Sequence, residues 1–580
     1  MQADTISQSS RAIDRLVHAS LGKLTGGMSP IALYQAWQDW ASHAACAPGK
    51  QVELAENAMR SLGRVSLYGF SRLSGKDVKP PYTPLPQDYR FRHPDWQKLP
   101  FSLIQQMFLM QEQWWHYATT RIPGVSPRNE NMVEFGARQI LDMFSPTNLP
   151  WLNPEVIETV RKTGGRNFVQ GFQNWLEDVR RTINNEPPVG AEAYKVGENL
   201  AVTPGKVVYR NRIMELIQYS PATDKVFAEP ILIVPAWIMK YYILDLSPHN
   251  SLVRWLVEQG HTVFMISWFN PGPDDRDLSM DDYREMGVMD AIKAINAIVP
   301  DRKIHAAGYC LGGTMLSIAA ATMARERDER LATMTLIAAQ TDFKEAGELM
   351  LFINESQLTF LEDIMWEQGY LDAKQMSGAF MMLRSKDLLW SRLINEYMKG
   401  ERPQLNDLMA WNADSTRMPY TMHSQYLRRL FLNNDLAEGR YDVDGRPIFL
   451  RDLRLPIFAV GATKDHVAPW PSVFKIRRLT SSPEVTFCLA KGGHNAGIIS
   501  EPGHPNRDYL IHTRHSGDRT YSPEEWKTIA ERHEGSWWLA WQDWIARHSD
   551  SKRVAPPPLG NTEAGYPPIC DAPGTYVYQR

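Results

Sequence analysis

The chain has 580 residues, with 63 Lys and Arg against 66 Asp and Glu, and its formal net charge of −3 gives no electrostatic reason to bind nucleic acid. Its 43% hydrophobic and 22% charged content is that of a globular protein, and its length predicts two domains or one large, decorated domain. The four cysteines lack Cys-x-x-Cys spacing, which argues against a disulfide framework and a metal site and favours a reducing cytoplasm.

No targeting or membrane segment is expected. The first residues contain no basic region followed by an apolar run, so a signal peptide is not predicted. Residues 304–324 are about long enough to span a bilayer and carry no formal charge. Three glycines and a switch from strand to helix interrupt this stretch, so we interpret it as buried core.

The N-terminal part of the chain has helical periodicity. Residues 1–28 are polar and Ser-rich, and we expect them to be a disordered tail. From there to about residue 186, apolar residues recur at helical spacing, as in residues 102–117, without strand alternation. Pro187 and Pro188 follow Asn and Glu residues and indicate a linker. We therefore predict an α-helical N-terminal domain over residues 1–188.

Beyond the linker, short predicted strands alternate with helices. Several of these strands are continuous apolar runs, which is typical of a mostly parallel sheet buried on both faces. The eight expected strands cover residues 206–209, 214–219, 231–234, 262–268, 303–309, 333–338, 455–461 and 485–490. The pattern predicts an α/β catalytic domain over residues 189–580.

Two helical additions to this domain are expected. Residues 341–440, between the sixth and seventh strands, are rich in Met, Leu and aromatics, and we interpret them as a cap or lid. Residues 524–549 contain five tryptophans and are predicted to form a terminal helix. The last thirty residues are rich in Pro and Gly and are expected to be irregular.

The candidate nucleophile follows the fifth strand. Gly308-Tyr309-Cys310-Leu311-Gly312 has the Gly-x-Cys-x-Gly pattern of the α/β-hydrolase nucleophile elbow, with Cys in place of Ser. The small residues allow strand and helix to approach closely, and the sharp turn between them exposes the nucleophile. Motif and position together predict an α/β-hydrolase fold with an eight-stranded, mostly parallel sheet.

The same fold predicts the remaining catalytic groups, since its chain order is nucleophile, acid, histidine. Asp465 follows the seventh strand through a short Gly turn, and His494 lies in a Gly-rich loop after the eighth. We predict a triad of Cys310, His494 and Asp465. His466 is a competing base, interpreted as structural because it stands beside the acid at a strand end.

Acyl transfer also requires an oxyanion hole. The backbone N–H of Leu311 is one expected donor, and Ala236 or Trp237, in the loop after the third strand, would supply the second. A Cys acyl-enzyme is itself a thioester, so the acyl group stays activated. The thiol therefore favours a transferase that accepts an acyl group from a thioester such as acyl-CoA.

The elbow, Gly308–Thr314, resembles the modified lipase box of poly(3-hydroxyalkanoate) synthases. Further blocks resemble the same family, and they cover nearly the whole chain from about residue 85; they include residues 88–91, 196–203, 241–248, 250–253, 260–264, 267–271, 411–414 and 535–538. The family loop often has the sequence Val-Pro-Pro-x-Ile-Asn-Lys, whereas residues 234–240 here are Val-Pro-Ala-Trp-Ile-Met-Lys. This departure affects details of the oxyanion loop.

The resemblance implies a single-subunit, class I-like polymerase with no cofactor. Cys310, activated by His494, would attack an (R)-3-hydroxyacyl-CoA, and CoA would leave; a 3-hydroxyl deprotonated through Asp465 and His494 would then attack the next thioester. The partners implied are the growing polyester chain, the granule surface and a second copy of the chain in a homodimer. The implied location is the cytoplasm, at polyester granules.

Two alternatives remain at this stage. One is a Cys-dependent thioesterase or polyester depolymerase of the same fold. The other is a catalytically silent granule scaffold protein, against which the complete set of Cys310, Asp465 and His494 argues.

Overall fold

The computed structural model describes residues 13–22, 25, 27–372, 375 and 385–580. The chain divides into two compact units, one formed by Gly22–Val189 with Met376–Gln404 and the other by Met1–Leu21, Gly190–Gln375 and Leu405–Arg580. Of the expected disordered tail, residues 1–12 lie outside the described residues, but residues 13–22 form a helix, so the expectation was wrong for them.

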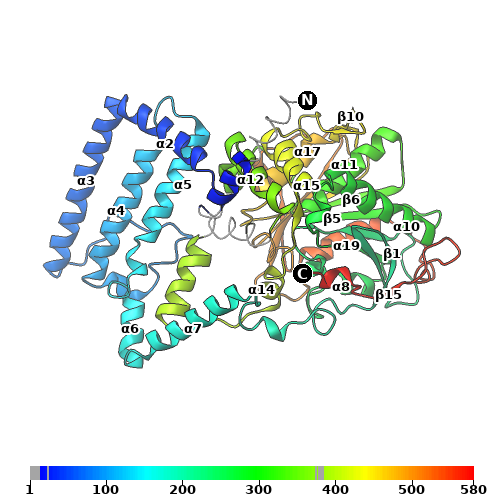
Figure 1. Cartoon of the computed structure of the whole chain (residues 1–580), viewed down its shortest axis with the longest axis horizontal. Helices are drawn as coiled ribbons and strands as arrows, with labels where there is room; N and C mark the ends of the chain where they lie inside the picture. The colour runs from blue at the N-terminus through cyan, green and yellow to red at the C-terminus, as the bar shows by residue number, and fades with distance from the viewer. Residues whose placement is uncertain (1–12, 23–24, 26, 373–374, 376–384) are drawn as a thin grey trace. The chain divides into compact units, whose positions relative to one another are not determined.

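The first unit is helical. Helices α3, α4, α5 and α2 pack side by side (blue to cyan in Figure 1). Its helices are α2 (Pro30–Ala45), α3 (Pro48–Leu73), α4 (Phe101–Thr119), α5 (Pro127–Met143), α6 (Pro154–Thr163) and α7 (Arg166–Ile183). Four of them begin with proline, whose fixed φ suits the first helical position. Arg90, largely buried, bridges the carboxylates of Asp88, Glu112 and Asp142.

Part of the expected cap belongs to this helical unit. The segment Leu393–Met398 packs along α7, where Asn167 Nδ2 donates to Met398 O at 2.7 Å and Asn174 Nδ2 donates to Glu396 O at 2.9 Å. The expected insertion at residues 341–440 is therefore divided between the two units rather than being one body.

The second unit is built on an 11-stranded sheet with the order β14-β13-β12-β11-β6-β5-β3-β4-β2-β1-β15. The eight expected strands are all present; they are β1 (Gly205–Arg210), β2 (Met214–Tyr219), β3 (Ile231–Val234), β4 (Val263–Trp268), β5 (Ile304–Tyr309), β6 (Leu331–Ile337), β11 (Ile457–Ala462) and β12 (Glu484–Ala490). Six neighbouring strands pair in parallel, in the order β12, β11, β6, β5, β3 and β4. Strand β2 joins β4 antiparallel. This confirms an α/β fold with a mostly parallel centre.

Three strands of this sheet were missed, so the expected count of eight was too low for it. They are β13 (Asp508–His515), β14 (Glu531–Glu534) and β15 (Cys570–Asp571), and each extends an edge of the sheet by antiparallel pairing. Their sequences are polar because one or both of their faces are partly exposed, and apolar periodicity cannot detect such strands.

Helices cover the sheet and connect its strands. The principal ones are α8 (Leu252–Glu258), α10 (Asp290–Ile298), α11 (Leu311–Glu326), α16 (Trp470–Phe474), α17 (Ile476–Leu479), α18 (Pro523–Ile529) and α19 (Trp537–Arg547). The cap elements of this unit are α12 (Glu355–Gln368), α14 (Asp407–Asn412), α15 (Tyr420–Gln425) and the π-helix Tyr426–Leu432. Residues 304–324 form β5, the turn at Cys310 and most of α11, and all but Cys310 and Ala324, which are half-buried, are buried. Every helix in the described ranges is too short or too polar to cross a bilayer.

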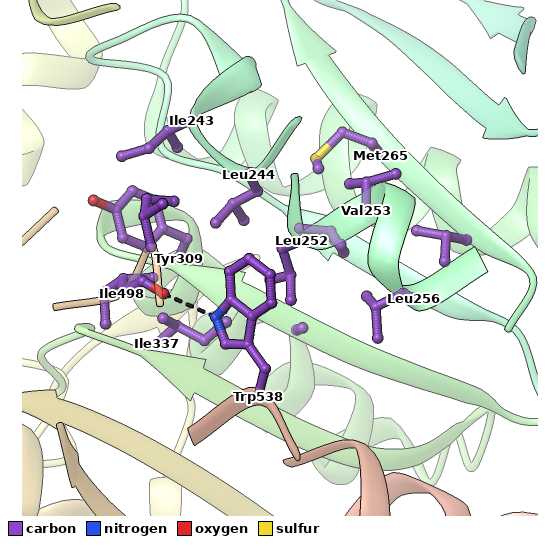
Figure 2. Packing of buried hydrophobic residues seen from close by; sticks show 14 of the residues in the cluster. Ile243, Leu244, Leu252, Val253, Leu256, Met265, Tyr309, Ile337, Ile498 and Trp538 are labelled. Carbon is purple, nitrogen blue, oxygen red and sulfur yellow. Dashed lines mark hydrogen bonds between the residues drawn. The ribbon is translucent and has the colours of Figure 1, made fainter. Parts of the chain in front are cut away.

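The expected terminal helix over residues 524–549 is interrupted. It consists of α18, strand β14 and α19, with Gly535 at φ 95° between the end of β14 and Ser536, the N-cap of α19. That φ lies in the left-handed region that favours glycine, and it ends the preceding segment. Trp538 of α19 packs among Leu252 and Leu256 of α8 and Ile337 of β6, close to Tyr309 at the end of β5 (Figure 2).

Candidate active site

Cys310 occupies a strained turn between β5 and α11. Its φ of 52° and ψ of −126° are unusual for a residue with a side chain. The Cys310 N–H donates to Ile337 O at 2.8 Å, which fixes the turn to the neighbouring strand β6. The geometry is that of a nucleophile elbow, as the Gly-x-Cys-x-Gly pattern predicted.

The glycines of the motif are required by close backbone contacts. A Cβ on Gly308 would lie 2.3 Å from Gly313 Cα, and a Cβ on Gly312 would lie 2.1 Å from Val234 O. Both distances are far below any normal van der Waals contact. These glycines therefore let α11 press against the ends of β5 and β3, which brings Cys310 beside the loop after β3.

Asp465 and His494, predicted from separate loops, lie together. His494 Nδ1 and Asp465 Oδ2 are 2.7 Å apart, and both residues are buried. The other carboxylate oxygen accepts the N–H groups of Val467 and Ala468, each at 2.8 Å. The acid is thus oriented by its own turn, and its imidazole partner is His494 rather than the competing His466.

Electrostatics links this pair to the nucleophile. Burial by itself would lower the pKa of His494, but the nearby Asp465 carboxylate and Cys310 sulfur raise it to about 10. An imidazole placed between a carboxylate and a thiol in this way can hold a proton near the sulfur. The structure thus brings Cys310, His494 and Asp465 into one cluster.

The loop that carries His494 is held firmly. Gly492 O accepts from Lys464 N at 2.7 Å, which joins this loop to the loop of Asp465. From α19, the indole of Trp538 donates to Ile498 O at 2.9 Å, shown as the dashed line in Figure 2. These contacts hold the His494 loop in place beside the elbow.

Two contacts at the site had no signal in the sequence pattern. The hydroxyl of Tyr309, inside the elbow, donates to Asn495 Oδ1 at 2.6 Å and so ties the elbow to the residue after His494. The phenol of Tyr426, a cap residue, lies near enough to the Cys310 sulfur for that sulfur to raise its pKa, after the larger effect of burial. Only tertiary packing brings these residues to the site.

The loop after β3 lies against the start of α11. Ala236 and Trp237 are buried, and in the described part of the chain their backbone N–H groups have no hydrogen-bond partner, nor has that of Leu311. The Trp237 indole donates to Met422 Sδ of the cap at 3.3 Å. Unpaired N–H groups beside the thiol, at the positive end of a 16-residue helix, suit a developing oxyanion.

No metal site accompanies this cluster in the ranges that the structure describes, where no group of three His, Cys, Asp or Glu side chains is placed to hold an ion. The chemistry available to the described residues is that of a thiol, an imidazole, a carboxylate and backbone donors. This combination suits covalent acyl transfer.

A mostly parallel sheet with Cys310 after β5, Asp465 after β11 and His494 after β12 defines an α/β-hydrolase-fold protein. Comparison with protein families agrees, since the model "alpha/beta hydrolase fold" matches residues 229–500. The models "Poly-beta-hydroxybutyrate polymerase (PhaC) N-terminus" and "Poly-beta-hydroxybutyrate polymerase N terminal" match residues 87–256 and 8–50.

Individual relatives extend the match over most of the chain. The poly(3-hydroxyalkanoate) polymerase of Methylorubrum extorquens is 38% identical over 545 residues, which cover 92% of this chain and 88% of the relative. The polymerase subunit PhaC of Rhizobium meliloti is 37% identical, with 88% and 82% covered, and that of Cupriavidus necator 35%, with 84% and 83% covered. The chain belongs to the poly(3-hydroxyalkanoate) polymerase family, and it is an enzyme, an acyltransferase.

Proposed function

We propose that the chain polymerises (R)-3-hydroxyacyl-CoA into poly(3-hydroxyalkanoate) through a covalent thioester on Cys310, with release of CoA. The observation that carries this proposal is the buried His494–Asp465 pair, with 2.7 Å between Nδ1 and Oδ2, next to a cysteine at the nucleophile elbow. Membership of the polymerase family supplies the reaction class.

In the first step, the Cys310 sulfur attacks the thioester carbonyl of the substrate. The developing oxyanion accepts hydrogen bonds from the N–H of Leu311 and from the N–H of Ala236 or Trp237. The bond between the carbonyl carbon and the CoA sulfur breaks, and the CoA thiolate takes a proton from the His494 imidazolium. The acyl group remains on Cys310 as a thioester.

Acylation changes the charge around the histidine. The Cys310 sulfur helps to raise the pKa of His494, and this contribution disappears once the sulfur is acylated. His494 then acts as a base that accepts the proton of a 3-hydroxyl on the bound unit or chain end. The resulting alkoxide attacks the carbonyl of the next acyl-CoA thioester, and an ester bond forms as the bond between that carbonyl carbon and the CoA sulfur breaks. The departing CoA thiolate takes the proton from the His494 imidazolium, and the chain has grown by one unit.

The acceptor explains the choice of thiol. A thioester intermediate keeps the acyl group at nearly the activation of acyl-CoA, so transfer to a hydroxyl remains favourable. An oxyester on serine would lose this advantage. We therefore expect Cys310→Ser to retain only a small fraction of the activity.

The insolubility of the product indicates where the enzyme works. Poly(3-hydroxyalkanoate) is insoluble, so we propose that the chain works at the surface of cytoplasmic polyester granules, and as a homodimer. The resemblance to the single-subunit synthases supports both points. Sedimentation of the purified protein with and without polymer tests them directly.

Incubation of the purified chain with 3-hydroxybutyryl-CoA tests the function. Release of CoA together with insoluble polyester is the expected result, and free 3-hydroxybutyrate as the sole acyl product would contradict it and favour the thioesterase. Cys310→Ala should abolish CoA release. Cys488→Ala is the matched control, because Cys488 is buried in β12 and burial raises the pKa of its thiol.

A further inference from the structure

The segment Thr575–Arg580 is anchored to the central sheet. The buried carboxylate of Glu215, on β2, accepts the N–H groups of Thr575 and Tyr576 at 2.9 Å each and the Thr575 hydroxyl at 2.8 Å. Gly574 precedes these residues, and a Cβ there would lie 2.3 Å from a Glu215 oxygen. A specific charged group thus fixes where this segment starts.

From this anchor the segment reaches the oxyanion loop. Lys240, at the end of that loop, is only 3% exposed. Its Nζ donates to Gln579 O at 2.8 Å and to Tyr576 O at 3.3 Å. No carboxylate of the described residues lies within ion-pair distance of it. Burial lowers the pKa of Lys240 to about 8, against the attraction of Asp414.

A buried ammonium held by backbone carbonyls is costly, because an apolar side chain could fill the same space without desolvation. The ammonium instead makes two directional hydrogen bonds, which connect the loop to the segment 575–580. Lys240 therefore does more than fill volume.

The carbonyls of the same loop are fixed from the other side. Trp411 Nε1 donates to Lys240 O at 2.7 Å, and the N–H and hydroxyl of Thr416 donate to Ile238 O, at 3.1 Å, and to Trp237 O. Trp268 Nε1 donates to Pro235 O at 2.8 Å. Because each peptide is planar, a fixed carbonyl also fixes the direction of the following N–H.

Segment 575–580 also hydrogen-bonds to Asp414 and Arg417, which lie close in sequence to Thr416, one of the residues that make these contacts. Arg580 Nη1 donates to Asp414 Oδ1 at 2.6 Å, and Arg417 Nη2 donates to Arg580 O at 2.7 Å. Gln579 Oε1 accepts from Asn270 N, beyond the end of β4, at 2.8 Å. One short segment thus braces the oxyanion loop directly and through the residues around Asp414.

We propose that Lys240 is a positioning residue and that Thr575–Arg580 is a brace, which together hold the loop of Ala236 and Trp237 in the geometry that receives the oxyanion. This inference rests on the proposed acyl transfer at Cys310. The hydrogen bonds of the brace go to the loop and to the residues around it, and none among the described residues goes to the thiol or to the His494–Asp465 pair.

The test compares two reactions of the same sulfur. Acylation by 3-hydroxybutyryl-CoA forms an oxyanion, whereas alkylation by iodoacetamide does not. Lys240→Met, similar in length and uncharged, should lower the single-turnover acylation rate at saturating substrate by about 10- to 100-fold. Its rate of Cys310 alkylation, followed by mass spectrometry of the Cys310 peptide, should stay within about twofold of the parent.

Three further variants complete the design. Lys240→Arg, which can still donate to both carbonyls, should recover part of the acylation rate. Ending the chain after Tyr578 removes Gln579 and Arg580, neither of which has an apolar side chain in the core. The shortened chain should therefore also lose acylation rate while keeping its alkylation rate. Lys303→Met is the control, because Lys303 is an exposed lysine that pairs with Glu329 just before β5, and it should change neither rate.

An unchanged ratio of acylation to alkylation in Lys240→Met and in the shortened chain would overturn the inference. A parallel fall of both rates together with the melting temperature would also overturn it, since that outcome indicates a structural role only. If Lys240→Met does not fold, the shortened chain decides the question. CoA release by Cys310→Ala would instead refute the proposed function, so the two failures are distinguishable.

Discussion

Gly312→Ala tests whether the close approach of α11 to the loop after β3 is required for activity. The added Cβ would lie 2.1 Å from Val234 O and 2.6 Å from Pro235 O, and both are backbone atoms that cannot rotate away. To restore a normal contact, the elbow and the loop must separate by about 1 Å, and a misplacement of that size can cost about 100-fold in rate. Overpacking of this kind also costs about 1–3 kcal/mol of stability.

The assay is CoA release from 3-hydroxybutyryl-CoA under single-turnover conditions, with thermal unfolding measured in parallel. We expect a loss of about 100-fold for Gly312→Ala in protein that is still folded. Gly493→Ala is the matched control: it stands beside His494, but its Cβ would lie 3.8 Å from the nearest atom, Lys464 O, which is an ordinary contact. A rate for Gly312→Ala within about threefold of the control would refute the reasoning.

Four further predictions concern the base and its support. The His494 pKa, followed by imidazole ¹⁵N shifts, should lie near 10 and fall substantially in Asp465→Asn, where the carboxylate is gone, burial still lowers the pKa and only the Cys310 sulfur still raises it; an unchanged value would contradict the assignment. Because the pKa of His494 is raised in the folded state, the stabilisation from its bound proton is complete below about pH 6.5 and is lost as the pH rises through about 10. Between these pH values, the thermal unfolding midpoint of the parent should therefore fall relative to that of Asp465→Asn. Tyr309→Phe removes the 2.6 Å hydrogen bond to Asn495 and should lower kcat about tenfold while leaving KM and the melting temperature nearly unchanged; a shift in melting temperature alone would point to packing. Trp538→Phe removes the hydrogen bond to the His494 loop and leaves a void, so a melting temperature lower by several degrees is expected, and calorimetry that shows none would argue against this anchor.

The strands that sequence analysis found and the strands that it missed differ in burial. Strands such as β5 and β11 are buried along their whole length, so their apolar runs are visible in the sequence. β14 consists of Glu, Arg, His and Glu, and it becomes a strand only by pairing with β13. Long-range pairing determines such segments, and a local pattern does not record it.

The division of the helical insertion has a similar explanation. Its residues have helical periodicity throughout, which predicts helices but not what they pack against. Asn167 and Asn174 of α7 hydrogen-bond to carbonyls of the segment Leu393–Met398, and these contacts join that segment to the N-terminal helices. Polar contacts between segments more than 200 residues apart have no signature in one sequence.

By itself, the sequence determined the elbow at Cys310 and the candidates Asp465 and His494, because each depends on a short motif at the end of an apolar strand. Only the tertiary structure decided how these groups are held: by Tyr309 through Asn495, by the tryptophans of α19, and by Lys240 with the segment 575–580. The reason is physical. A turn and its glycines are set by local sterics, whereas a hydrogen bond between residues hundreds of positions apart exists only after the sheet has brought their strands together.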